Sequence, residues 1–153
     1  MKIAFLMMAL TLPAMAAGNA GIVHYKASEL KGYEKKLAPK INDKKVATEQ
    51  LGKWGNHLMM VAHRQASGEA EVHKKQVDVF IVETGEATLV IGGTVVDGKE
   101  TAPGEIRGAS IKGGERMKVG PGDVVHIPAN TPHQTLVDPG KQVTYAVLKI
   151  DSE

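Results

Sequence analysis

The stretch Gly-Asp-Val-Val-His-Ile-Pro-Ala-Asn-Thr-Pro-His, residues 122–133, is the part of this sequence that decides its fold. Gly122 closes a Pro-Gly turn, and the β-branched residues after it predict a strand over Val124–Ile127. A second turn runs from Pro128 to Pro132 and leads directly to His133. Because the two prolines restrict the backbone, we expect this turn to hold the imidazole of His133 in a fixed position.

Residues 1–16 have the pattern of an export signal. A positive charge at Lys2 precedes an apolar run, Ile3–Leu12, and Ala14-Met15-Ala16 fits the small-residue pattern of a cleavage site. The run is too short to span a bilayer, and the alternative to a signal is a buried N-terminal helix. No cysteine follows the run, so a lipid anchor is excluded. We therefore expect a periplasmic or secreted protein with no membrane anchor.

The bulk composition excludes several classes of function. The chain has 153 residues and a formal net charge of +2, which falls by one if Lys2 is removed with the signal. Its length suits one domain, and so small a charge does not favour a nucleic acid or an anionic membrane as a partner. The sequence has no cysteine. This excludes a disulfide framework, a thiol nucleophile and a thiolate metal site.

Two segments follow the predicted signal. Residues 17–45 are rich in lysine, and we expect an arm with a short helix over Glu29–Leu37, capped by Ser28. Over residues 46–153, short β-branched runs alternate with Gly, Pro and Asp turns, which is typical of an all-β sandwich or small barrel. The region Lys99–Gly114 is expected to be a loop. The expected strands are Val46–Leu51, His57–Arg64, Glu69–His73, Val77–Thr84, Ala87–Ile91, Thr94–Val96, Met117–Val119, Val124–Ile127, Gln134–Val137 and Gln142–Ile150.

The expected strands Val77–Thr84 and Gln142–Ile150 are apolar on both faces. One face can fill the interior of a barrel, and the other needs a cover. The arm, a second sheet or a second subunit could provide that cover. We expect a homodimer.

Several polar residues share faces with the expected interior. Glu71 and His73 lie on one face of an alternating segment, and Asp78 shares a face with Phe80. A buried aspartate is costly unless a positive charge neutralises it. A divalent metal with imidazole co-ligands would do so, and His133 arrives from a distant strand to join the group.

These residues resemble the two sequence motifs of the cupin family. The second cupin motif reads Gly, five residues, Pro, one residue, Gly, two residues, His, three residues and Asn, and this spacing here selects Gly122, Pro128, Asn130, His133 and Val137. The first motif contains His-x-His, three or four residues, Glu, six residues and Gly, and here it selects Glu71, His73, Asp78 and Gly85. Every spacing fits, so the chain is similar to a small single-domain cupin over about Arg64–Ile150.

The resemblance implies an all-β fold, the cupin-type double-stranded β-helix, which is a jelly-roll-like small barrel, with a short N-terminal helical arm. It also implies a metal site, changed here to two histidines and two carboxylates because Glu71 replaces a histidine and Asp78 replaces a glutamate. Asn130 stands in place of a glycine, which is tolerable because asparagine adopts positive φ readily. A site without thiolates accepts zinc, manganese, iron or nickel; zinc is the expected metal because an exported chain is loaded outside the cytoplasm.

Three functions stay open at this point. The chain can be a metal-dependent enzyme of the oxygenase or isomerase type, acting on a small molecule. It can be a metal-free binding module for a small, sugar-like molecule, in which case Asp78 pairs with Lys74 or Lys75 and Glu71 is solvated. It can also be a structural protein whose arm drives assembly. Convergence of Glu71, His73, Asp78 and His133 on one point favours the metal site.

The remaining aromatic and histidine residues have less specific roles. His126 shares an alternating face with Val124 and is expected to line the same pocket as Phe80. His57 and His63 have no motif spacing, so we expect ordinary hydrogen-bonded side chains. Trp54 lies between two glycines and is expected to anchor the arm.

Overall fold

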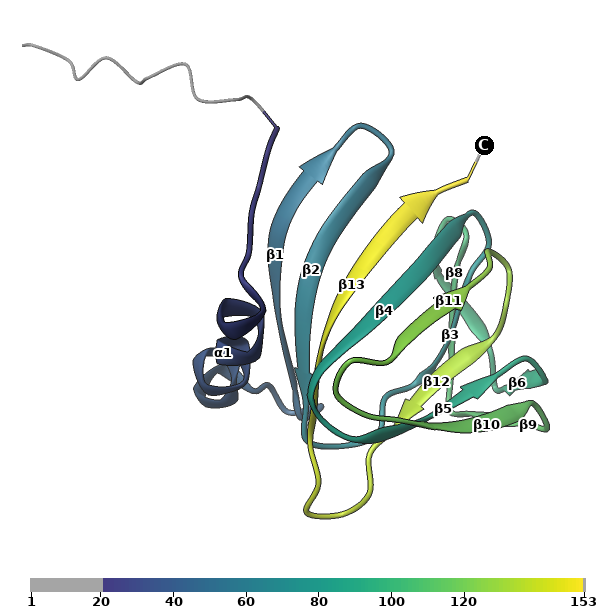
Figure 1. Ribbon diagram of the computed structural model, residues 1–153. Helices are drawn as coiled ribbons and strands as arrows, with labels where there is room; N and C mark the ends of the chain where they lie inside the picture. The colour runs from purple at the N-terminus through teal and green to yellow at the C-terminus, as the bar shows by residue number, and fades with distance from the viewer. Residues whose placement is uncertain (1–20, 153) are drawn as a thin grey trace, which may run out of the picture.

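The computed structural model describes residues 21–152 (Figure 1), so the predicted export signal lies outside the described residues. Two antiparallel sheets face each other. The first sheet has the strand order β1 (Val46–Trp54), β2 (His57–Arg64), β13 (Val143–Asp151), β4 (Gln76–Gly85) and β11 (Val124–Ile127). The second has the order β10 (Glu115–Val119), β5 (Ala87–Ile91), β12 (His133–Leu136), β3 (Ala70–His73), β8 (Glu105–Gly108) and β7 (Lys99–Ala102).

This arrangement confirms the predicted all-β jelly-roll fold. Strands that are distant in the sequence lie side by side: β13 pairs with both β2 and β4, and β12 pairs with both β3 and β5. Among the described residues, no helix is long and apolar enough to cross a membrane.

The region Lys99–Gly114 is not the loop that was expected. It contains β7, β8 and a third strand, β9 (Ser110–Lys112), which forms a separate hairpin-like sheet with β6 (Thr94–Val96). The residues of β7 are all exposed and mostly polar, so the sequence shows no buried face there. The strand that orders this region is β3, which pairs with β8 from a distant part of the chain.

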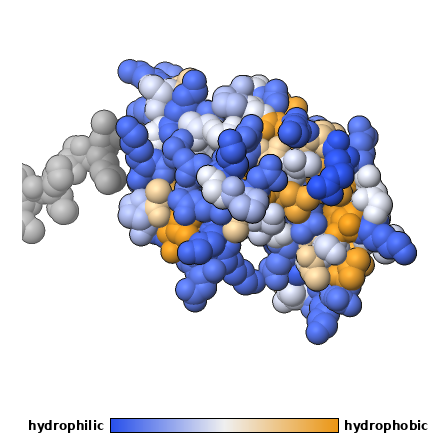
Figure 2. Space-filling view, turned by 90° about the horizontal axis from the view of Figure 1, so that it is seen from below, coloured by the Kyte–Doolittle hydropathy of each residue, from blue (hydrophilic) through white to orange (hydrophobic). Residues whose placement is uncertain are grey.

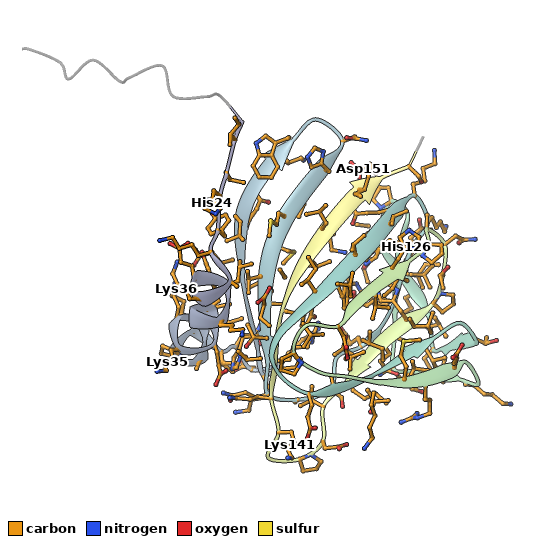
Figure 3. The ribbon with its side chains drawn as sticks, in the orientation of Figure 1. His24, Lys35, Lys36, His126, Lys141 and Asp151 are labelled. Carbon is orange, nitrogen blue, oxygen red and sulfur yellow. The ribbon has the colours of Figure 1, made fainter. Side chains whose placement is uncertain are left out.

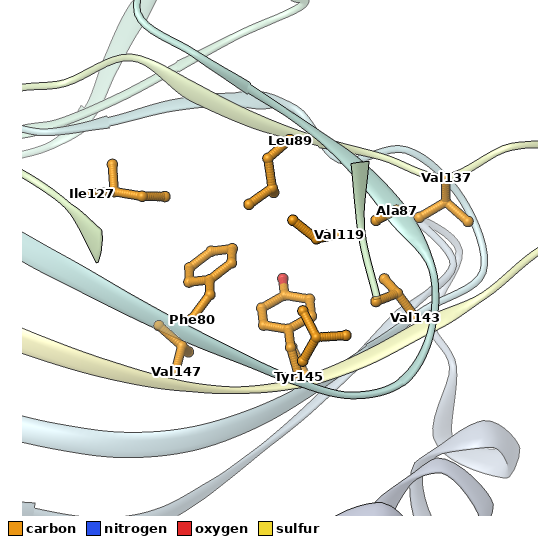
Figure 4. Close-up of a cluster of buried hydrophobic side chains, with 11 residues drawn as sticks. Phe80, Ala87, Leu89, Val119, Ile127, Val137, Val143, Tyr145 and Val147 are labelled. Atoms are coloured by element: carbon orange, nitrogen blue, oxygen red, sulfur yellow. The ribbon is translucent and has the colours of Figure 1, made fainter. Parts of the chain in front are cut away.

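The space between the two sheets is filled by the larger of two buried clusters (Figure 4). The rings of Phe80 and Tyr145 stack with their centroids 4.7 Å apart, and Leu89 and Ile127 close over them. Burial of this apolar surface is the main stabilising contribution, since the chain has no disulfide. The core ends where polar side chains begin, at Asp78 on β4 and Lys149 on β13.

The outer face of the first sheet is covered by the arm. The helix α1 (Ala27–Leu37), continued by the short 3-10 helix η1 (Ala38–Lys40), lies against this sheet. Leu37 and Tyr33 pack there on Val61 and Ala146, in a second buried cluster. The prediction that β4 and β13 need a cover on both faces is therefore confirmed, and the arm is that cover. A second subunit was one of the candidates to cover this face. Since the arm covers it, the homodimer is not supported by this face and stays a prediction.

The start of α1 differs from the expected one. The helix begins at Ala27, and the backbone N–H of Lys26 donates to Oε2 of Glu29 at 2.7 Å, so Ser28 lies within the first turn instead of capping it. Trp54 lies beside Gly21 and stacks on His57, with ring centroids 5.6 Å apart, which agrees with its predicted role as an anchor of the arm.

The face in Figure 2 is largely hydrophilic, and its apolar side chains form separate patches.

Candidate metal centre

Two of the predicted ligands come from β3 and a third from β12, which are neighbours in the second sheet. In this ladder His133 lies directly opposite Glu71, and directly opposed residues point to the same face of a sheet. His73 lies two residues after Glu71 and therefore points to that face as well. All three side chains face the first sheet across the interior.

The turn between Pro128 and Pro132 is attached to the strand that carries His73. Asn130 has a φ of 58°, which confirms the expectation that this position of the motif needs a positive φ. Its backbone N–H donates to the carbonyl of His73 at 2.7 Å. The two cupin-like motifs are thus joined by a backbone hydrogen bond, and the position of His133 depends on that of His73.

The fourth predicted ligand, Asp78, reaches the same place from the first sheet. Its Oδ2 lies 3.5 Å from Nε2 of His73 and 3.7 Å from Nε2 of His133. On the other side, Oε2 of Glu71 lies 3.5 Å and 3.8 Å from the same two nitrogens. One atom each of Glu71, His73 and His133 lies within 4.8 Å of the others. These three residues form the cluster, and Asp78 approaches both imidazoles from the first sheet without being one of its members.

These distances are longer than hydrogen bonds, and they match atoms that share one ion. A hydrogen bond between nitrogen and oxygen spans about 2.7–3.2 Å. Two ligand atoms that each lie ~2.1 Å from a tetrahedral zinc ion are ~3.4 Å apart. The observed separations of 3.5–3.8 Å are close to that value.

His133 has a buried nitrogen that no other described residue satisfies. Its Nδ1 lies 3.0 Å from the carbonyl oxygen of Thr131, which can only accept, so Nδ1 carries the proton and Nε2 presents a lone pair. Burial lowers the pKa of His133, which keeps the ring neutral. Nε2 is buried with no hydrogen-bond partner among the described residues, and the atoms it faces are carboxylate oxygens. A metal ion placed between Nε2 and these oxygens would bind the lone pair and remove its repulsion from the carboxylates.

His73 is held by a carboxylate that the sequence did not predict. Nδ1 of His73 lies 2.6 Å from Oε2 of Glu105, the residue opposite it on β8. A carboxylate on the far nitrogen of a ligating histidine orients the ring and increases its basicity. Burial alone would lower the pKa of His73, but the nearby carboxylates of Asp78 and Glu71 raise it above its ordinary value.

A lysine enters the site from β13. Lys149 lies opposite Asp78 in the β13–β4 ladder, and its Nζ lies 2.7 Å and 2.9 Å from the two carboxylate oxygens of Asp78. The same Nζ lies 3.0 Å from Nε2 of His73. This part of the site therefore attracts positive charge, whether it is a proton on His73, the ammonium of Lys149 or a metal ion.

Glu71 is held from behind by two arginines. One of its oxygens, Oε2, faces the imidazoles, and the other, Oε1, pairs with Arg107 and lies 3.7 Å from Arg64. Arg64 is itself fixed by the hydroxyl of Tyr145, at 3.0 Å from Nε. Burial alone would raise the pKa of Glu71; the contact with His73 and the charge of Arg107 outweigh it and lower the pKa to about 2. Glu71 is therefore an anion throughout the ordinary pH range.

The charges of the site balance without a metal. The acids Glu71, Asp78 and Glu105 face the cations Arg64, Arg107 and Lys149. This balance can hold a metal-free site together, but it leaves Nε2 of His133 without a donor. The donor set, its spacing and that lone pair fit a divalent ion, and the ammonium of Lys149 lies against part of the same donor set.

Two sequence-based expectations about this region were wrong. His126 is exposed on β11 (Figure 3), because Val125 and Ile127 are the residues that oppose the inward-facing Phe80 and Asp78. Both alternating faces of this strand carry valines, so the sequence gives no clear choice of the buried face. Asp78 pairs with Lys149, not with Lys74 or Lys75.

Phe80 and the remaining histidines lie where expected. Phe80 meets His133 edge to face, with centroids 6.3 Å apart, and so forms the apolar floor of the site. His63 is buried and bonded to the hydroxyl of Thr144 at 2.9 Å, as an ordinary core histidine. His57 stacks on Trp54.

Four charged residues of the site, Arg64, Glu105, Arg107 and Lys149, were missed from the sequence. Lys149 could have been found, since it continues the alternating inward face of Val143, Tyr145 and Val147. Glu105 and Arg107 could not, because they lie in the region that was expected to be a loop. Their places follow from the pairing of β8 with β3.

No family model and no curated protein sequence matches this chain. Solved structures do match it. The protein TT1209 from Thermus thermophilus superimposes with a TM-score of 0.56 at 17% identity, over 78% of this chain and 94% of that one. A Klebsiella pneumoniae protein with a double-stranded β-helix domain gives 0.54 at 12% identity, over 73% and 82%. The Streptomyces nucleoside dehydratase Pac13 gives 0.52 at 9% identity, over 73% and 74%.

Identities this low show the fold alone. The double-stranded β-helix of the Klebsiella pneumoniae protein is the architecture that the two motifs predicted, and β3, β4 and β12 carry the motif residues here. The chain therefore has a double-stranded β-helix fold.

Proposed function

We propose that this chain is an exported cupin that binds one divalent metal ion, zinc in the first instance, through Glu71, His73, Asp78 and His133. The metal would serve a reaction of the oxygenase or isomerase type on a small molecule. The observation that carries the proposal is the buried Nε2 of His133, which faces two carboxylates and has no donor among the described residues.

The residues around the four ligands support the proposal. Glu105 orients His73, and the carbonyl of Thr131 orients His133, so each imidazole is held with Nε2 toward the centre. Two neutral imidazoles and two carboxylates give an uncharged site around a divalent ion. Bound there, the ion would supply a Lewis acid for a carbonyl or hydroxyl oxygen of the small molecule.

A second candidate, a metal-free binding module for a small molecule, rests on Lys149. Its ammonium already neutralises Asp78 and lies against His73, so the buried acid does not require a metal. In that case Glu71 and the two imidazoles would bind the small molecule through hydrogen bonds. The lone pair of His133 would then accept a hydroxyl proton.

Calorimetric titration of the metal-free protein with zinc separates the two candidates. The metal site predicts one zinc ion per chain, and predicts that His133→Ala abolishes this binding. His126→Ala is the matched control, because it removes an exposed histidine outside the site and should bind zinc like the wild type. Absence of stoichiometric binding by the wild type, or equal binding by His133→Ala, would favour the metal-free module.

The compartment and the assembly are part of the same proposal. Residues 1–16 have the composition of a cleaved export signal, which predicts a mature chain that begins at Ala17 in the periplasm or the medium. N-terminal sequencing of the exported protein checks this. A homodimer is expected on cupin resemblance, and size-exclusion chromatography with light scattering measures it.

A further inference from the structure

Lys149 lies where a metal ion would bind two of its ligands. Its ammonium nitrogen lies 2.7 Å and 2.9 Å from the carboxylate oxygens of Asp78, and 3.0 Å from Nε2 of His73. An ammonium has three N–H donors, and these can serve all three contacts when Nε2 of His73 carries no proton. The lysine side chain is only 18% exposed, so its charge is held inside the barrel.

A metal ion and this ammonium cannot use the same lone pairs together. We propose that Lys149 is an internal competitor for the divalent cation: it occupies Asp78 and His73 in the metal-free chain and must leave before all four residues can ligate. This inference rests on the metal site proposed above. In this account, Lys149 sets the affinity of the site for divalent cations.

The ammonium satisfies only part of the site, which gives the metal its advantage. None of the hydrogen bonds of the described residues joins Lys149 to Glu71 or to Nε2 of His133. A divalent ion would be bound by these two residues in addition to Asp78 and His73. The exchange therefore replaces a singly charged cation on two residues by a doubly charged one on four.

The lysine side chain has a route out of the site. Lys149 lies near the end of β13, which finishes at Asp151, and its neighbour across the strand pair with β2 is the half-buried Leu58. A four-carbon stem with free rotation can move the ammonium toward solvent while its methylene groups stay on the sheet.

Lys149→Met tests the proposal, because methionine keeps the length of the side chain and removes the charge. We expect the dissociation constant for zinc, measured by competition with a chelator of known affinity, to fall at least about tenfold relative to the wild type. Lys75→Met is the matched control: it removes an exposed lysine from the β3–β4 turn and so makes a similar change in net charge near the site. Its zinc affinity should equal that of the wild type within about twofold.

A measurement on the wild-type side chain guards against a variant that fails to fold. In protein labelled with ¹³C at the lysine ε position, the Lys149 resonance is assigned by its absence from Lys149→Gln. Saturation with zinc should move this resonance toward the value of the solvent-exposed lysines and leave the Lys75 resonance in place. A Lys149 resonance that does not move at saturation would overturn the proposal.

The outcomes separate this inference from the proposed function. Zinc binding by the wild type with equal or weaker binding by Lys149→Met overturns the competition and leaves the metal site intact. Zinc binding by Lys149→Met alone supports the competition and shows that the native site is closed to zinc. If neither protein binds zinc, both the metal site and the competition are wrong.

Discussion

The backbone N–H of Asn130 donates to the carbonyl of His73 at 2.7 Å, and this one bond joins the turn that delivers His133 to the strand that carries the other imidazole. The turn holds Asn130 at a φ of 58°. Two sequence motifs that are distant along the chain thus become one site through a backbone contact. The residue at position 130 must tolerate the left-handed region for this contact to form.

Asn130→Gly should therefore be tolerated and Asn130→Val should not. Glycine adopts a positive φ freely, so we expect a change in the free energy of unfolding below ~1 kcal/mol. A β-branched residue at this φ should cost on the order of 2 kcal/mol and displace His133. Urea unfolding measures the first effect and zinc affinity the second. Equal stability of the two variants would show that the turn does not require this conformation.

Gly85 and Gly122, both motif glycines, should respond differently to alanine. Both have positive φ, 73° and 93°, so each variant should lose about 1–2 kcal/mol of stability from strain. At Gly85 the added Cβ would also collide with the carbonyl oxygen of Gln142, whereas at Gly122 it would meet nothing within 4 Å. We expect the extra cost at Gly85 to be roughly 1–3 kcal/mol or more. Chemical denaturation of the two variants side by side tests the difference.

Because α1 covers the outer face of the first sheet, we expect Leu37→Ala to lower the free energy of unfolding strongly. Leu37 is fully buried between α1 and the sheet, so its truncation should cost about 2–5 kcal/mol of unfolding free energy. Lys35→Ala, on the exposed side of the same helix (Figure 3), should change stability by less than ~0.5 kcal/mol. Similar losses in the two variants would mean that α1 does not pack as described.

The lowered pKa of Glu71 predicts that the metal-free protein loses stability in acid. Its pKa is lowered from 4.5 to about 2 on folding, because the contact with His73 and the charge of Arg107 outweigh burial. The folded state binds this proton more weakly than the unfolded state does, so the contribution to stability is complete above about pH 4.5 and is lost as the pH falls toward 2.

Comparison of the wild type with Glu71→Gln isolates this contribution. The difference in unfolding free energy between the two metal-free proteins should shrink by on the order of 3 kcal/mol as the pH is lowered through that range. Urea titrations at a series of pH values, with a chelator present, provide the measurement. A difference that stays constant over the range would show that Glu71 is not held as an anion by its neighbours.

The sequence could predict the fold because local signals and motif spacing agreed. Turns marked by Gly and Pro delimit the strands, and the motif spacing selected Glu71, His73, Asp78 and His133, whose side chains approach one another from two sheets. Their role as metal ligands stays a prediction. The double apolar pattern of β4 and β13 predicted a cover, although the identity of that cover depended on tertiary packing.

The rest of the site could not be predicted because it depends on pairing between distant strands. Glu105 and Arg107 have their roles only because β8 pairs with β3, and β8 lies in a region without a buried apolar face. His126 was placed on the wrong side since alternation alone does not tell which face of β11 is buried. Lys149 is the exception: its alternation with Val143, Tyr145 and Val147 could have revealed it, although a lysine is normally expected in solvent.

The most direct test of the central claim is elemental analysis of the wild-type protein and of His133→Ala, each purified from the compartment to which it is exported and with no metal added. We predict about one transition-metal ion per wild-type chain, with zinc predominant, and a content near zero in His133→Ala. A wild-type protein that carries no stoichiometric transition metal, or a variant that carries as much as the wild type, would contradict it.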